Sequence, residues 1–232
     1  MITAIRWEII KVLELFSGTE CISNAFRARG HECYTIDWDE KFPSSWHTDI
    51  SKVIAQDILE RFGHPDVIWI GTDCTSYSIA AISYHRKKNP ETGNLDPVSD
   101  YAKFCDDMNI HVKELVKELK PKFYFWENPR AGLRKMEFMQ DIPRYTITYC
   151  QYMQNEPWET RRMKPTDIWT NHPDPQFKPP CKNGAACHPP APRGSNKYGT
   201  QALKDATLRS MYPKELCEHI VDICEEEYER RE

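Results

Sequence analysis

Apolar runs of strand length recur along the chain and alternate with stretches of helical periodicity. Six runs have the length and composition of buried strands, at residues 11–16, 32–36, 66–70, 122–127, 145–149 and 166–170. Residues 99–120 carry apolar side chains at helical spacing, namely Phe104, Met108, Val112, Leu115, Val116 and Leu119. Strands that alternate with helices predict an α/β fold, doubly wound, with a mostly parallel sheet.

The pattern changes in the last third of the chain. Residues 171–196 are rich in Pro, Gly and Asn and lack periodicity, which predicts a long constrained loop. Beyond it, Leu216, Ile220 and Ile223 form an apolar stripe on a helix that Pro213 can start. We therefore expect a core over residues 1–169, a small irregular insert over 170–208, and a segment over 209–232 that returns to the core as a helix.

The composition is that of a soluble protein with one main core. The chain has 232 residues, 40% of them hydrophobic, which is enough for one compact domain. There is no run of about 18 apolar residues, and residues 1–16 carry charges where a signal peptide needs an unbroken apolar segment. Nine dispersed cysteines favour free thiols in a reducing compartment. We expect a cytoplasmic monomer with no membrane partner.

The charges are strongly segregated although the net charge is only −4. Residues 161–214 contain ten Lys or Arg against three Asp, and residues 215–232 contain eight acidic residues against two Arg. A basic segment followed by an acidic tail can be a polyanion-binding face beside a solvated helix. An ordinary solvated surface explains these charges about as well.

Polar residues of chemical interest follow four of the predicted strands. They are Ser17 to Cys21, Asp37, Cys74, and the pair Glu127-Asn128. Ligands of parallel α/β folds bind beyond the carboxyl ends of the strands, so we expect these residues to converge on one crevice. Loops are generally polar because they contact water, which explains any one of these residues but less readily a Cys together with an acid.

Cys74 and Glu127 together would form a nucleophile and an acid. A thiolate is a strong nucleophile that needs a nearby positive charge, and the basic residues at 161–164 must offset the anion of Asp73. Glu127 ends an aromatic strand, where burial would raise its pKa and let it donate a proton to a ring nitrogen. The alternative for Cys74 is a small buried hydrophobic residue without chemistry.

Seven segments occur in the order found in the C5-cytosine-specific DNA methyltransferases, which the chain resembles over nearly its whole length. Three segments resemble cofactor-binding motifs of the family: LELFSGTEC (13–21) is similar to the S-adenosylmethionine loop, TIDWD (35–39) to the segment with the ribose-binding acid, and HTDI (47–50) to the segment that contacts the adenine. Two resemble catalytic motifs: GTDCTSYS (71–78) is similar to the nucleophile loop, and ENPRAG (127–132) to the Glu-Asn-Val element. The last two are YCQYMQNEPWETRRMK (149–164), which is similar to the region that ends in an arginine pair, and RSMYPKELCEHI (209–220), which is similar to the last motif. The short chain and the form of ENPRAG resemble the compact members carried by bacteriophages.

The resemblance implies a Rossmann-like fold and a DNA cytosine-5 methyltransferase that depends on S-adenosylmethionine. A cytosine would be flipped out of the helix, Cys74 would attack its C6, and C5 would take the methyl group. The resemblance makes Glu127 the group that holds and protonates N3, Asn128 the residue that orients the loop, and Arg162 the residue that steadies the intermediate. The implied cofactor-binding residues are Phe16, Ser17, Gly18, Thr19, Glu20, Asp37, Trp38, Asp49, Ile50 and Ser210.

The expected partner is double-stranded DNA, contacted by a small recognition segment. In this family a large domain before the last motif selects the target, whereas here about 40 residues (170–208) fill that place. We therefore expect a short or relaxed sequence preference, with affinity mainly from phosphate contacts. The candidate DNA-binding residues are Ser78, Arg130, Lys164, Lys182, Arg193 and Lys197, with Lys178 and Lys204 as further phosphate contacts.

Three departures from the family pattern leave alternatives open. Glu20 replaces the last Gly of the cofactor loop, Asp73 replaces the Pro before the nucleophile, and Arg209-Ser210 replace Gly-Asn. One alternative is a related cytosine-C5 enzyme with a variant cofactor that carries a negative group; another is a decayed DNA-binding homologue. The small insert also fits an RNA (tRNA) cytosine-5 methyltransferase. A thiol oxidoreductase is disfavoured because no Cys-x-x-Cys pair is present.

The insert contains a potential metal-binding group. Cys181, Cys187 and His188 lie close together in sequence, and Cys150 could be a fourth ligand. A zinc ion would help to order a segment too short for its own core. Because Cys-x₅-Cys-His is not a standard zinc spacing, free thiols and a surface His are the preferred interpretation at this stage.

Overall fold

Seven strands form one sheet at the centre of the molecule. In the computed structural model, which describes residues 8–190, 203 and 205–229, the strand order is β3-β2-β1-β4-β7-β9-β8. The strands are β1 (Lys11–Leu15), β2 (Glu32–Asp37), β3 (Trp46–His47), β4 (Val67–Ile70), β7 (Phe123–Pro129), β8 (Arg144–Thr148) and β9 (Pro165–Thr170). The first five in this order pair in parallel, whereas β9 is antiparallel to both β7 and β8. The prediction of a mostly parallel sheet is confirmed.

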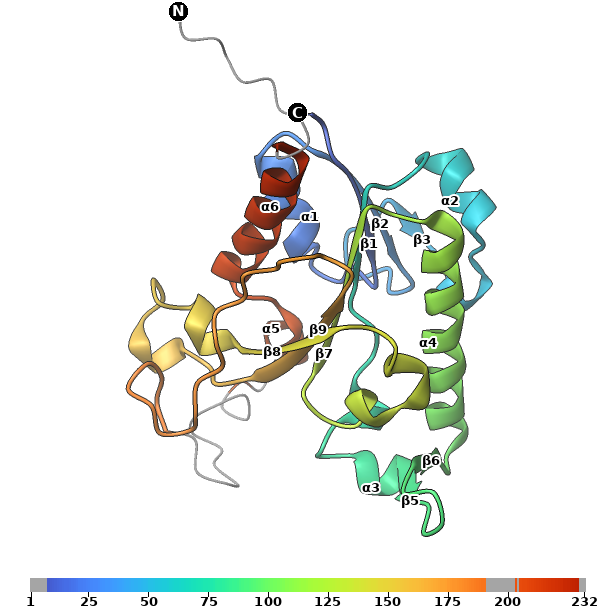
Figure 1. Cartoon of the computed structure of the whole chain (residues 1–232), viewed down its shortest axis with the longest axis vertical. Helices are drawn as coiled ribbons and strands as arrows, with labels where there is room; N and C mark the ends of the chain where they lie inside the picture. The colour runs from blue at the N-terminus through green and yellow to red at the C-terminus, as the bar shows by residue number, and fades with distance from the viewer. Residues whose placement is uncertain (1–7, 191–202, 204, 230–232) are drawn as a thin grey trace, which may run out of the picture.

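Helices cover both faces of the sheet. Those that form the layers are α1 (Cys21–Ala28), α2 (Ala55–Arg61), α4 (Asp100–Leu119) and α6 (Lys214–Glu229), and the shorter ones are α3 (Ile82–His85) and α5 (Ala206–Ser210). Figure 1 shows α1 and α6 on one face and α2 and α4 on the other. Each face has its own buried apolar cluster, one with side chains of α2 and α4 and the other with side chains of α1 and α6. The sheet is therefore doubly wound, as predicted.

The long helix α4 begins and ends where its sequence dictates. The Ser99 side chain accepts a hydrogen bond from the Ala102 amide at the N-terminus, and Lys120 ends the helix in a left-handed conformation with φ 47°. The apolar stripe of α4 is buried as expected, with one exception. Phe104 is 49% exposed, and Cys105 takes its place in the core. The exception arises because Phe104 lies at the edge of the stripe, one residue before the line that faces the sheet.

Short elements connect the layers. Two of them, β5 (Arg86–Lys88) and β6 (Leu95–Pro97), form a separate antiparallel hairpin after α3. The 3₁₀ helices are η1 (Ile50–Lys52), η2 (Thr75–Tyr77), η3 (Leu133–Lys135), η4 (Glu137–Met139), η5 (Tyr149–Tyr152) and η6 (Trp158–Thr160). Residues 171–190, the described part of the expected insert, contain no helix or strand. In the described part of the chain no helix is both long and apolar enough to cross a membrane.

Candidate active site

The candidate nucleophile lies directly after β4. Cys74 is half-buried at the start of η2, and Asp73 accepts hydrogen bonds from the Thr75 amide at 2.6 Å and the Thr75 hydroxyl at 3.3 Å. Burial and then the charge of Asp73 raise the pKa of the Cys74 thiol to about 11, while the charge of Lys164 lowers it. The thiol is therefore protonated at neutral pH.

Strand β7 holds the nucleophile loop from the side. Its Trp126 donates from Nε1 to the Thr72 hydroxyl at 3.1 Å, and Asn128 donates from Nδ2 to the Thr72 carbonyl at 3.1 Å. The other side-chain atom of Asn128, Oδ1, is buried and has no hydrogen-bond partner among the described residues. Asn128 is thus placed to orient the loop that carries Cys74, with one acceptor atom left for a ligand.

Glu127 belongs to a buried group with Tyr149 and Lys164. Its Oε1 accepts a hydrogen bond from the Tyr149 hydroxyl at 3.1 Å and lies 4.0 Å from Lys164 Nζ, which in turn donates to the Tyr149 oxygen at 3.3 Å. Burial raises the pKa of Glu127, whereas the charge of Lys164 and the bond from Tyr149 lower it. Burial is the largest of these effects, so the environment favours a carboxyl group that can keep a proton.

Two partners of Glu127 differ from the sequence prediction. We expected Lys164 on the DNA-binding surface, but its side chain is only 14% exposed and lies inside the site. Tyr149 was not predicted as a site residue, although it ends the strand predicted at 145–149, as Glu127 ends the strand predicted at 122–127. The contact between Tyr149 and Glu127 depends on β8 and β7 both pairing with β9, which no local pattern reveals.

Arg162 lies beside Tyr149, with its guanidinium carbon 5.9 Å from the centre of the Tyr149 ring, but it makes its hydrogen bonds elsewhere. It is 8% exposed and donates to the backbone carbonyls of Leu208 at 2.7 Å and Met211 at 3.4 Å. Burial lowers the pKa of this guanidinium. In this structure Arg162 therefore positions the segment between α5 and α6, and Lys164 is the cation beside Glu127.

A cavity of about 370 Å³ opens next to the nucleophile loop. Four predicted cofactor residues line it, namely Phe16, Trp38, Asp49 and Ile50. Thr72 and Asp73, the two residues before Cys74, also line it, and α4 contributes Tyr101, Phe104, Cys105, Met108 and Asn109. The sequence did not predict that α4 would contribute side chains to this cavity. Phe104 is exposed because its side chain lies in the cavity wall and not in the core.

The predicted cofactor loop is tightly turned and fixed by Asp37. Phe16 and Gly18 have φ values of 59° and 47°, in the left-handed region that favours glycine. The carboxylate of Asp37 accepts hydrogen bonds from the Gly18 amide at 2.8 Å and the Asp39 amide at 2.9 Å. The Ser17 hydroxyl is buried without a hydrogen-bond partner in the described structure. Ser17, Gly18 and Asp37 are thus brought together beside the cavity without lining it.

Glu20 and Thr19 make internal contacts. The Glu20 carboxylate accepts from Arg27 at 2.8 Å and from the Thr35 hydroxyl at 2.6 Å, and the residue is 7% exposed. Thr19 Oγ1 lies 3.1 Å from Cys21 Sγ. The side chain that replaces the expected Gly is therefore directed towards α1 and β2, and its charge is neutralised there. This placement departs from the prediction that Glu20 contacts a cofactor.

The remaining predicted residues lie apart from the cavity. Ser210 is exposed on α5 and donates to the Thr207 carbonyl at 2.8 Å, and Ser78 donates to the Thr75 carbonyl at 3.2 Å within the nucleophile loop. Arg130 and Lys182 are exposed. Lys178 forms an ion pair with Glu215 at 3.2 Å, so its charge is already partly compensated. Arg193, Lys197 and Lys204 lie outside the described residues.

The fold and the cavity define the class of protein. A doubly wound sheet with a cavity at the carboxyl ends of β1 and β4 is the arrangement of the Rossmann-like nucleotide-binding enzymes, a class that includes the S-adenosylmethionine-dependent methyltransferases. The sequence profile of one family of that class, described as C-5 cytosine-specific DNA methylase, matches residues 10–144. Because this match covers more than half of the chain, the protein belongs to the C-5 cytosine-specific DNA methylase family.

One solved structure shows the same fold at low sequence identity, and a second aligns more weakly. The Entamoeba histolytica methyltransferase EhMeth aligns with a TM-score of 0.51 and 11% identity, over 77% of this chain and 58% of that one. Dnmt2 methyltransferase of S. pombe aligns with a TM-score of 0.47 and 12% identity, over 70% of this chain and 49% of that one. The chain thus spans about half the length of these two structures. No curated protein sequence matches it.

Proposed function

We propose that the protein methylates C5 of cytosine in double-stranded DNA through a covalent bond between Cys74 and C6. The observation that carries the proposal is the position of Thr72. Thr72 lines the cavity and lies two residues before Cys74 in the sequence. It also accepts hydrogen bonds from Trp126 and Asn128, the residues immediately before and after Glu127 in the sequence. Thr72 thus connects the nucleophile, the acid and the cavity at one edge of the sheet, which is what a transfer between two bound molecules requires.

The cavity fits the chemistry of S-adenosylmethionine. Phe16, Trp38 and Ile50 offer aromatic and apolar surfaces for an adenine ring. The buried Asn109 Oδ1 has no hydrogen-bond partner in the described structure and can accept a bond from an exocyclic amine. Asp37, beside the cavity, is the residue we assign to the ribose hydroxyls. When bound here, S-adenosylmethionine supplies the methyl group.

The residues of the site divide the reaction between them. The Cys74 thiol gives its proton to water, and its sulfur then bonds to C6 of an extruded cytosine while Glu127 gives its proton to N3, so the electron pair of the C5–C6 double bond is directed to C5. After C5 takes the methyl group, water removes the C5 proton, and the electron pair of that C–H bond re-forms the C5–C6 double bond and expels the Cys74 thiolate. N3 then returns its proton to Glu127. Lys164 stabilises negative charge on Cys74 before attack and on Glu127 after proton transfer, since its charge acts on both groups.

DNA is the proposed substrate, and RNA is the second candidate. Arg130 and Lys182 are exposed cations, and the β5–β6 hairpin that follows the nucleophile loop presents exposed Lys87 and Lys88. These cations can contact phosphates of either nucleic acid. The short insert, which leaves little surface for reading base edges, is the feature that keeps RNA as the alternative.

The test is mass spectrometry of nucleosides from plasmid DNA and, separately, tRNA after incubation with S-adenosylmethionine. We expect 5-methylcytosine in DNA with the wild-type protein and with Cys33→Ser, a half-buried cysteine on β2, and none with Cys74→Ala. Methylated tRNA with unmodified DNA would support the RNA alternative instead. A cytosine product of another mass would indicate a variant cofactor, and unmodified nucleic acids throughout would indicate a binding protein without turnover.

A further inference from the structure

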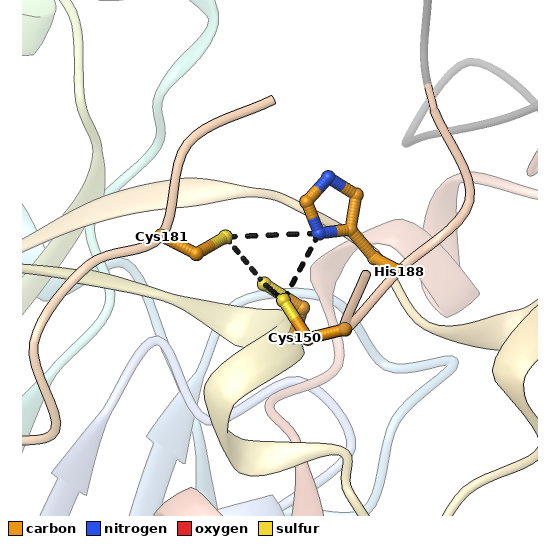
Figure 2. A group of neighbouring side chains, drawn as sticks. Cys150, Cys181 and His188 are labelled. Atoms are coloured by element: carbon orange, nitrogen blue, oxygen red, sulfur yellow. Dashed lines mark hydrogen bonds between the residues drawn. The ribbon is translucent and has the colours of Figure 1, made fainter. Parts of the chain in front are cut away.

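Four potential metal ligands meet outside the proposed active site. Cys150 comes from η5, directly after the edge strand β8, while Cys181, Cys187 and His188 come from the insert. Figure 2 shows the Cys150 and Cys181 side chains and the His188 ring directed towards a common centre. The three sulfur atoms and a ring nitrogen of His188 all lie within 4.8 Å of one another.

The spacing of these atoms is close to that of a small tetrahedron with one short edge, between the sulfurs of Cys150 and Cys181. Cys150 Sγ lies 3.0 Å from Cys181 Sγ and 3.9 Å from Cys187 Sγ, and His188 Nδ1 lies 3.7 Å from Cys181 Sγ and 3.3 Å from Cys187 Sγ. Bond lengths of about 2.3 Å to sulfur and 2.0 Å to nitrogen place the ligands of a tetrahedral zinc ion about 3.5 to 3.8 Å apart. A disulfide needs about 2.05 Å between sulfurs, well below the Cys150–Cys181 distance.

Neighbouring groups hold the four ligands in place. The Cys181 amide donates to the Thr148 hydroxyl at 3.0 Å, and Gln151 donates from Nε2 to Cys187 Sγ at 3.4 Å. Trp158 donates from its indole nitrogen to the Ala186 carbonyl at 2.9 Å, which fixes the turn before Cys187. Hydrogen bonds from an amide N–H to a sulfur stabilise a thiolate, the form that binds metal.

We propose that Cys150, Cys181, Cys187 and His188 bind one Zn²⁺ ion in a closed structural site. Three thiolates and an imidazole are a ligand set that zinc takes in structural sites, with no position left for water. His188 is 1% exposed, so its position in the interior differs from the surface position expected from sequence. The geometry thereby reverses the preference for free thiols that the irregular Cys-x₅-Cys-His spacing had favoured.

The ion supplies the insert with the cross-link that its sequence lacks. Residues 171–190 have no helix or strand of their own, so few backbone hydrogen bonds hold them to the sheet. Zinc would join the insert to η5, where Tyr149, the neighbour of Cys150, contacts Glu127. The site therefore fixes the insert next to the proposed active site, without taking part in the chemistry.

The first test is the metal content of the full-length protein, purified under reducing conditions without a His-tag. We expect about one zinc per chain. Less than about a tenth of an equivalent, with all cysteines free or with a Cys150–Cys181 disulfide found by mass spectrometry, would overturn the proposal. Both results are independent of any methyl transfer, so failure of the metal site and failure of the proposed function are distinguishable.

The second test identifies the ligands without relying on loss of folding. Cobalt substituted for zinc in the wild-type protein should give the intense visible bands of tetrahedral cobalt and a thiolate-to-cobalt charge-transfer band in the near ultraviolet. Cys181→Ser should lose the metal or change these bands, His188→Cys should retain it with a stronger charge-transfer band, and Cys33→Ser should leave the spectrum unchanged. A weak octahedral spectrum in the wild-type protein would contradict the closed site.

Discussion

The environment of the Cys74 thiol favours its protonated form. Burial and the adjacent Asp73 raise its pKa to about 11, and the charge of Lys164 opposes them. Since the thiolate is the reactive form, the resting protein has little nucleophile exposed to oxidants or electrophiles. Lys164 is therefore the residue that we expect to set the reactivity of the thiol.

Removing the charge of Lys164 should make Cys74 less reactive. For Lys164→Met we predict that alkylation of Cys74 by iodoacetamide requires a higher pH, with a rate at fixed pH about tenfold lower for each unit by which the thiol pKa rises. Peptide mass spectrometry separates Cys74 from the other cysteines. Lys103→Met, at an exposed site on α4, is the matched control. An unchanged pH profile in Lys164→Met would show that Lys164 does not act on the thiol.

The sequence predicted those residues of the candidate site that lie at the ends of recognisable strands, and it did not predict the others. Cys74, Glu127 and Asp37 each follow a recognisable strand, and parallel strands deliver their carboxyl ends to one edge. The role of Asn109 could not be predicted in this way, because an Asn within an apolar helical stripe gives no sign that its side chain faces a cavity. The burial of Lys164 beside Glu127 could not be predicted either, because it depends on a contact with Tyr149, which lies 15 residues away along the chain.

Two elements meet closely at Gly71, the residue that directly follows β4. A Cβ atom added there would overlap the hydroxyl of Tyr212, which precedes α6. The Tyr212 ring is half-buried and packs edge-on against Trp69, with ring centroids 5.1 Å apart, so it would have to shift from this contact to admit a Cβ atom. The glycine is required here for close approach of a side chain from another element.

Gly71→Ala should therefore destabilise the protein by about 1 to 3 kcal/mol through overpacking. The double variant Gly71→Ala with Tyr212→Phe should recover most of that loss, because the clashing oxygen is removed and the ring carbon that carried it lies 3.7 Å from the new Cβ, an ordinary contact. Urea unfolding of the two single variants and the double variant gives the coupling free energy. Additive effects would show that the hydroxyl is not the obstacle.

Strand β1 carries a buried acid that makes the stability of the protein depend on pH. Glu14 is 1% exposed and accepts a hydrogen bond from the Ser23 amide at 2.8 Å. Burial raises its pKa from the ordinary 4.5 to about 7. Between these two values the unfolded chain loses the proton while the folded chain keeps it. The stability that protonated Glu14 contributes is therefore fully present below its pKa in the unfolded chain, and it is lost as the pH rises through its pKa in the folded protein.

We predict that the free energy of unfolding contributed by Glu14 falls as the pH rises from 4.5 to about 7, by roughly 3 kcal/mol in total. Glu14→Gln, which keeps the shape and cannot ionise, should remove this part of the pH dependence. The measurement is urea unfolding of both proteins across that pH range. Parallel pH curves for the two proteins would show that Glu14 ionises equally in the folded and unfolded states.

At the scale of elements, the long apolar runs were predictable and the short pieces were not. All six predicted strands and the helix at 100–119 are present, because each has enough residues to show its period. Strand β3 has two residues, and β5 and β6 have three each, too few for any pattern. The place of β9 between β7 and β8 is a topological choice that the local sequence does not encode.

At the scale of the whole molecule, the part of the insert that the structure describes offers little surface for reading a long DNA sequence. The described part of the insert is an irregular loop without helix or strand, and its Lys178 is paired with Glu215. Few base-edge contacts are then available, and specificity should be low. We predict that bisulfite sequencing of a plasmid methylated in vitro will show a target of at most about three base pairs. A defined target of about six would contradict this prediction.

The acidic tail is part of the assembled structure and not only a solvated face. Glu225 on α6 pairs with Arg29 at 2.8 Å and lies 3.0 Å from His31, while Asp222 pairs with Arg29 at 2.7 Å. Together with the Lys178–Glu215 pair, these contacts use acidic residues to join α6 to α1 and to the insert. The sequence showed the segregation of charge but not the partners, which lie far away along the chain.

One face of the sheet is completed by the two ends of the described chain. Ile10, Val12, Ile22 and Phe26 from the start pack with Leu216, Ile220, Val221 and Ile223 of α6. During synthesis the ribosome releases the early strands long before α6, so this apolar face has no cover while most of the chain is being translated. We therefore expect the nascent chain to expose this apolar face until α6 is available to cover it.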